Sequence, residues 1–314
     1  MRPHARSIAP TLARLIAPAV AAGLLAGCTV AGTTAAPPDV STPAPSTPTP
    51  AASTSAAPSS RPGTYALSSD PDALVLRIDT TGGLIAPGVV LTHIPAFSLY
   101  ADGRIVTIGA VDAIYPGPLL PNLIESKLTA DEVQKLLAAA DDAGLLGPDA
   151  AYDVGGVADA GTTTFTTTVA GKTHRVSAYA LGIGGDPGAE PDVVQARAKL
   201  DAFESKAFDL GSFLGHAVNH TIYRPTAARL YVGEPAQVQP PMTQQELAWP
   251  LGVDPATGEP TLNPGSKCLA IGGADFTTFL AVARTANELT VWKAPSGRYS
   301  LQVRPLLPGE SGCA

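Results

Sequence analysis

The order of apolar and polar residues predicts strands in the first part of the chain's body. Leu74, Leu76 and Ile78 recur at every second position, which places them on one face of a strand because successive side chains alternate. Asp102-Gly103 lies between two β-rich runs, and Asp-Gly is a strong hairpin signal since glycine accepts a positive φ. The predicted strands are residues 73–79, 97–100 and 105–107, followed by a hairpin that pairs residues 162–169 with 174–180 around Gly171.

Helical spacing marks three other segments. Thr129 and Glu132 have the spacing of a capping box, and Gly144 is a typical helix stop. Between them apolar residues recur at intervals of three and four, as on the buried side of a helix. The same pattern predicts helices over residues 192–214 and from Asp275 onward, with Asp275 as the N-terminal cap of the latter.

The last part of the chain is shorter and richer in loops. Its predicted elements are strands over residues 227–232 and 268–271, a Pro- and Gly-rich loop over 233–267, and a closing hairpin over 289–306. Strands that pair as hairpins, with helices set apart from them, indicate α+β architecture rather than a parallel doubly wound sheet. We therefore predict an α+β fold of antiparallel β-hairpins with packed helices, in two small sub-domains, residues 63–220 and 221–314.

The first residues have the pattern of a bacterial lipoprotein signal. Three arginines precede an apolar run over residues 15–25, which is about half of the ~20 residues that a membrane-spanning helix needs. The run ends in Leu-Ala-Gly-Cys at Cys28, which resembles the lipobox, whose cysteine thiol accepts a diacylglyceryl group. We predict a signal peptide over residues 1–27 and lipid attachment at Cys28. The alternative is an ordinary secretory signal with a coincidental cysteine.

A linker of Ala, Thr, Ser and Pro follows the lipobox. Residues 28–62 contain too few large apolar side chains to offset the entropy cost of ordering. We therefore expect this segment to be disordered, and to act either as a stalk through a cell-wall layer or as an inert spacer.

Charge separates the body, residues 63–314, from the leader and linker. The chain has 20 basic and 27 acidic residues, and residues 1–62 hold four of the bases and one of the acids. The body thus has a net charge near −10, although the whole chain has −7. This balance argues against nucleic-acid binding, and it would repel anionic lipid headgroups.

The chain has three cysteines, too few for a disulfide-dense scaffold. If Cys28 carries lipid, Cys268 and Cys313 are left as a pair in an oxidising compartment. A bond between them would tie down the C-terminus. The alternative is two free thiols.

Candidate chemistry is sparse. His216 and His220 have the four-residue spacing with which one helix face can hold a metal. They lack the Glu of a zinc-protease motif, so polar residues at a helix end are the favoured interpretation. Asp153 and Asp159 flank a glycine pair that could coordinate calcium, but a turn with capping aspartates fits better because the EF-hand pattern is missing. The sequence has neither Gly-x-Ser-x-Gly nor Ser-x-x-Lys.

Several longer runs resemble uncharacterised secreted or lipid-anchored proteins of high-GC actinobacteria. The resemblance covers nearly all of the body and implies no catalytic residue. It is consistent with a Cys268–Cys313 pair near the matching C-terminal segment. The runs that carry it are residues 94–105, 115–118, 157–163, 179–182, 225–227 and 304–308.

These observations predict a lipid-anchored protein on the extracytoplasmic face of the cell membrane. We expect its body to be a binding or interaction module at the cell envelope, with an envelope protein or glycan as partner and no nucleic acid. We expect no catalytic residue, no cofactor and no bound metal. The alternatives are an extracytoplasmic hydrolase with an unrecognised site, or a carrier of an apolar ligand.

Overall fold

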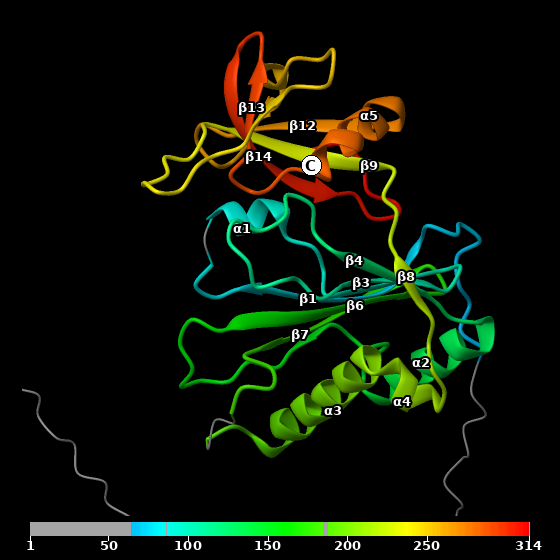
Figure 1. Cartoon of the computed structure of the whole chain (residues 1–314). Helices are drawn as coiled ribbons and strands as arrows, with labels where there is room; N and C mark the ends of the chain where they lie inside the picture. Colours follow the sequence, from blue (N-terminus) through cyan, green and yellow to red (C-terminus); the bar gives the residue numbers. More distant parts are fainter. Residues whose placement is uncertain (1–63, 86, 185–187, 314) are drawn as a thin grey trace, which may run out of the picture. The chain divides into compact units, whose positions relative to one another are not determined.

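The computed structural model describes residues 64–313 except 86 and 185–187. The predicted signal peptide, Cys28 and the linker lie outside this part of the chain. In the described part, fourteen strands form two sheets and five helices pack beside them, so the predicted α+β fold class is confirmed (Figure 1). Both sheets belong to one compact unit.

The first sheet has eight strands in the order β5-β7-β6-β1-β2-β3-β4-β8. Neighbouring strands are antiparallel except β5 and β7. Strands β1 to β4, and the pair β6 and β7, are neighbours in both chain and sheet, as successive hairpins produce, whereas β1 pairs with β6 and β4 with β8 over longer stretches of chain. The strands are β1 (Leu74–Gly82), β2 (Phe97–Tyr100), β3 (Arg104–Ile108), β4 (Leu123–Lys127), β5 (Ala150–Ala151), β6 (Gly161–Val169), β7 (Lys172–Tyr179) and β8 (His220–Ile222).

Both predicted hairpins of this sheet are present. The turn between β2 and β3 contains Gly103, whose φ of +86° is of the left-handed kind that glycine tolerates. In the second hairpin Val169 pairs with Lys172, so Ala170 and Gly171 form a two-residue turn with positive φ at both positions. Such turns match the twist of the strands that they join.

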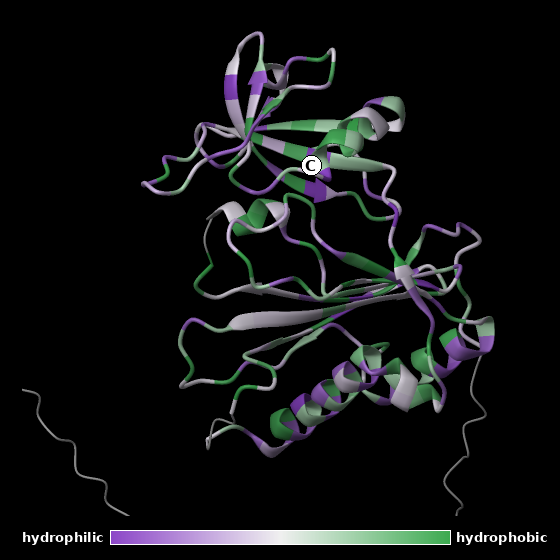
Figure 2. Ribbon diagram, viewed as in Figure 1, coloured by the Kyte–Doolittle hydropathy of each residue, from purple (hydrophilic) through white to green (hydrophobic). Residues whose placement is uncertain are grey.

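Helices α2 (Ala130–Asp142), α3 (Pro191–Phe208) and α4 (Leu210–Leu214) cover one face of the first sheet (Figure 1). Polar and apolar residues alternate along α3 in Figure 2, and its buried side includes Leu200, Phe203 and Ala207. These side chains belong to a core that also contains the inward residues of β1, β2, β6 and α2. The capping box of α2 is confirmed, because Thr129 and Glu132 each accept a hydrogen bond from the other's backbone N–H.

Two helix predictions need correction. The helix predicted over residues 192–214 is interrupted at Asp209, whose φ of −117° and ψ of 65° are not helical. Its carboxylate accepts a hydrogen bond from the Ser212 N–H and so starts α4 as a separate helix. Asp275 is not a cap, because α5 (Gly273–Ala283) begins two residues earlier and Gly272 is its N-cap.

The second sheet has six strands in the order β10-β13-β14-β9-β12-β11. The segment predicted as loop over residues 233–267 contains short strands and a 3-10 turn, η1 (Pro255–Thr257), which its hydrophobic pattern did not reveal. Helix α5 packs against this sheet, and the core between them contains Phe279 and Trp292, both fully buried. The strands are β9 (Ala227–Gly233), β10 (Glu246–Ala248), β11 (Glu259–Pro260), β12 (Lys267–Gly272), β13 (Val291–Ala294) and β14 (Gly297–Pro305).

The chain passes from the first sheet to the second at residues 223–226, directly after β8. Around this connection, a small cluster of buried side chains from both parts of the chain packs together, including Tyr100, Tyr223 and Leu307. The Tyr223 hydroxyl donates to the Leu306 carbonyl at 3.0 Å, and Arg304 donates to the His93 carbonyl at 2.8 Å. We call this contact region the junction. Helix α1 (Pro87–Thr92) lies beside β14, near the junction.

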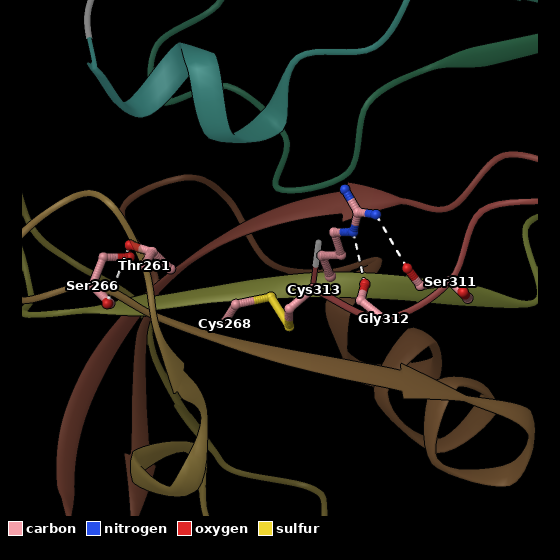
Figure 3. The surroundings of a disulfide bond; sticks show 7 residues. Thr261, Ser266, Cys268, Ser311, Gly312 and Cys313 are labelled. Atoms are coloured by element: carbon pink, nitrogen blue, oxygen red, sulfur yellow. Dashed lines mark hydrogen bonds between the residues drawn. A yellow bond between two sulfur atoms is a disulfide. The ribbon is translucent and has the colours of Figure 1, made fainter.

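A disulfide joins Cys268 and Cys313, as the cysteine count predicts (Figure 3). Cys268 lies in β12, and Cys313 lies in the tail that follows β14. The tail is also held by Arg229 of β9, which donates hydrogen bonds to the Ser311 and Gly312 carbonyl oxygens. The C-terminal tail is therefore fixed against the second sheet.

Candidate functional site

A cavity of about 510 Å³ opens at the junction. We call it the junction pocket. Pockets of roughly 300–1,000 Å³ with a mainly apolar lining and a few polar groups are typical of small-molecule sites. The lining of the junction pocket comes from four separate stretches of chain: Leu120, Pro121, Asn122, Leu123, Ile222, Tyr223, Arg224, Pro225, Phe276, Leu280, Arg284 and Pro305.

One wall of the pocket is a single side of α5. Phe276, Leu280 and Arg284 are four residues apart, and residues at this spacing lie above one another on a helix. Phe276 is buried, Leu280 is partly buried and Arg284, the C-cap of the helix, is exposed. The wall therefore changes from apolar to cationic along the helix.

Most of the remaining lining comes from the end of the first sheet and the connection after it. Leu123 at the start of β4 is buried, whereas Ile222 at the end of the edge strand β8 is 71 % exposed. Tyr223 is buried, and burial raises the pKa of its hydroxyl. The hydroxyl thus stays neutral and keeps its hydrogen bond to Leu306. That bond fixes the connection beside the pocket.

Arg224 and Arg284 are the charged residues of the lining, which contains no acidic side chain. Both are exposed. Among the described arginines, only these two and Arg175 make no hydrogen bond or ion pair through their guanidinium groups with another described residue. Arg175 lies on β7, near the opposite edge of the first sheet. Two of the three unpaired guanidinium groups thus line one pocket.

A second cavity, of about 420 Å³, lies between the first sheet and α4. It is lined by Ser126, His220 and Asp209, among others. The Ser126 hydroxyl and His220 Nδ1 are 2.7 Å apart, a distance that a nucleophile and its base would need. However, Ser126 is only 4 % exposed, and no described carboxylate orients the His220 ring. The pair cross-links the neighbouring strands β4 and β8.

The two histidines of the predicted pair have different partners. His216 follows α4, and its Nε2 lies 2.7 Å from a Glu132 carboxylate oxygen. Hydrogen bonding to the Ala217 carbonyl and to Glu132 raises the pKa of His216. His220 is instead the first residue of β8. The expectation of two histidines at one helix end is therefore wrong, because α4 ends at Leu214.

The aspartates of the glycine-containing loop have backbone roles. Asp153 accepts a hydrogen bond from the N–H of Tyr179, the last residue of β7, at 3.1 Å, so its partner lies 26 residues away and not within the predicted turn. Asp159 has a φ of 55°, in the left-handed region that aspartate tolerates better than most residues. In the described part of the chain, no group of three His, Cys, Asp or Glu side chains is placed to hold a metal ion.

No pattern in the sequence points to the junction pocket as a site. The apolar spacing of α5 predicts Phe276 and Leu280 on one side, and the same spacing extended to Arg284 could have placed it there. Arg224 has no such signal, because it lies in an irregular connection before Pro225. Only the packing of the two sheets brings it to α5.

Comparison with protein families, curated proteins and solved structures gave no match for this chain. The resemblance to secreted actinobacterial proteins stays a prediction. Within the described residues, no helix has the length and apolar character needed to cross a bilayer.

Proposed function

We propose that this protein is a lipid-anchored binding module of the cell envelope and that its ligand site is the junction pocket. The pocket itself carries the proposal. It combines an apolar interior with two unpaired cations at residues 224 and 284, and a few polar groups in an apolar concavity are what a ligand site needs for affinity and orientation.

Binding fits the described side chains better than hydrolysis does. The closest approach to a nucleophile and base, Ser126 and His220, has a buried serine and lacks an orienting carboxylate among the described residues. A carrier of an apolar ligand, by contrast, uses the same pocket as the binding module.

The pocket is tested with a neutral apolar fluorescent probe, N-phenyl-1-naphthylamine, and the purified full-length chain. We expect the probe to bind the wild type and to lose most of that binding in Leu280→Trp, because the larger ring fills the cavity. Thr277→Trp is the matched control, since Thr277 is on the exposed side of the same helix. Equal probe binding by both variants would contradict the proposal. Ile222→Trp, at an exposed position, serves if Leu280→Trp unfolds.

The anchor at Cys28 has its own test. We expect mass spectrometry of the mature protein to show an N-terminal cysteine that carries a diacylglyceryl group. A single acyl chain gives only weak, reversible attachment, so stable anchoring requires the two-chain form. An unmodified Cys28, or cleavage further along the chain, would contradict the anchor without affecting the pocket.

A further inference from the structure

We propose that the junction pocket binds a single-chain amphiphile with one anionic head, a carboxylate or a phosphate, and an apolar tail. This inference rests on the proposed function and names the chemical class of its ligand. Four features carry it: the unpaired guanidinium groups, the apolar interior, the absence of acidic lining residues and the charge of the body.

The two arginines fit an anionic head. The planar guanidinium group presents a fork of N–H donors that matches a carboxylate or a phosphate. Arg224 and Arg284 lie on different elements, the connection between the sheets and the end of α5, yet line the same pocket. Since neither is paired with a described carboxylate, no internal ion pair has to be broken when a ligand binds.

The interior fits an apolar tail. Phe276 and Leu123 are each 3 % exposed, and the partly buried Leu280 belongs to the same lining. The arginines are exposed. A ligand that satisfies both parts places its tail against the buried side chains and its head at the exposed guanidinium groups.

The charge of the body selects a single molecule rather than a membrane surface or a polyanion. The body has a net charge near −10, so an anionic bilayer or a nucleic acid is repelled over most of its surface. A small amphiphile contacts only the pocket, where the lining charges are both positive.

The test compares ligands that differ in one feature. Dodecanoate and dodecyl phosphate carry both parts, 1-dodecanol carries the chain alone, and inorganic phosphate and acetate carry the head alone. Binding to the full-length chain with Cys28→Ser, which prevents acylation, is measured by titration calorimetry below micelle-forming concentrations. The affinities for the first two ligands also distinguish a carboxylate head from a phosphate head.

We expect dodecanoate or dodecyl phosphate to bind at least about tenfold more tightly than 1-dodecanol, because hydrogen bonds to charged groups contribute this much or more. The double variant Arg224→Gln/Arg284→Gln should abolish the difference. Arg175→Gln, which removes the remote unpaired arginine, should preserve it. The three arginines are exposed, so these variants should fold.

Each of the other possible results contradicts one part of the proposal. If neither dodecanoate nor dodecyl phosphate binds more tightly than 1-dodecanol, the anionic head is refuted and the apolar pocket of the proposed function remains. Equal binding of phosphate and dodecyl phosphate would refute the apolar tail. If no chain-bearing ligand binds, both the inference and the proposed function fail.

Discussion

Arg304 places a charged group in the interior of the junction. It lies near the end of β14, is 7 % exposed, and makes a two-pronged ion pair with Glu310 at 2.6 and 2.9 Å. Glu310 also accepts a hydrogen bond from the Leu307 N–H. Burial alone would raise the pKa of Glu310, but these hydrogen bonds and the charge of Arg304 outweigh it and hold the pKa below its usual range.

We predict that Glu310→Gln lowers the free energy of unfolding by about 3 kcal/mol, because it leaves a buried guanidinium group without its counter-charge. Urea unfolding at neutral pH measures this. Glu246→Gln is the control. Glu246 pairs with Lys293 and Arg298 on the surface, where solvent screens an ion pair and its contribution to stability is small. Similar losses in both variants would contradict the role of burial.

The same pair predicts a pH dependence. Because the pKa of Glu310 is lower in the folded protein than in the unfolded chain, its stabilisation is complete above the usual glutamate pKa of about 4. It is lost as the pH falls through the folded-state value. Stability should therefore decline less steeply below about pH 4 in Glu310→Gln than in the wild type.

At the scale of elements, local sequence signals were reliable where chain neighbours satisfy each other. The capping box of α2 and the two hairpins depend on residues a few positions apart, and all are present. The helical spacing of apolar residues continues past residue 208, so the sequence pattern predicts one helix there. It gives no sign of the non-helical backbone at Asp209. The start of α5 was missed because Gly272 and Gly273 turn the chain directly out of β12.

Two glycines with the same φ allow the cost of a left-handed φ to be measured separately from the cost of a steric clash. Gly103 and Gly144 both have a φ of +86°. A Cβ added at Gly103 would clash with the Leu128 carbonyl oxygen, whereas a Cβ added at Gly144 would meet no atom within 4 Å. Gly144→Ala should cost about 1 kcal/mol for the left-handed conformation. Gly103→Ala should cost about 3 kcal/mol, because overpacking adds to that strain. Equal unfolding midpoints would contradict the clash.

At the scale of the whole molecule, the C-terminal tail connects the second sheet to the junction. The disulfide at Cys313 and the hydrogen bonds from Arg229 hold the tail, and the tail presents Glu310 to Arg304. The cysteines are 45 positions apart. Loss of the disulfide thus affects the second sheet and the junction together.

We predict that Cys268→Ser/Cys313→Ser lowers the free energy of unfolding by up to about 4 kcal/mol, the chain-entropy value for a loop of this length. Reductant should lower the stability of the wild type to that of the double variant, and leave the variant unchanged. Urea unfolding with and without reductant measures both. An unchanged wild type under reducing conditions that free both thiols would contradict the prediction.

Local periodicity and turn chemistry in the sequence were enough to predict the α+β class, the main hairpins and α2. Counting predicted the Cys268–Cys313 pair only on the condition that Cys28 carries lipid, and the structure contains that disulfide. The sequence also predicts the lipid anchor at Cys28, which lies outside the described residues. The junction pocket, by contrast, exists only because the chain folds as it does. Its lining comes from residues 120–123, 222–225, 276–284 and 305, and no local pattern relates positions so far apart. Packing of the two sheets brought them together and left Arg224 and Arg284 unpaired.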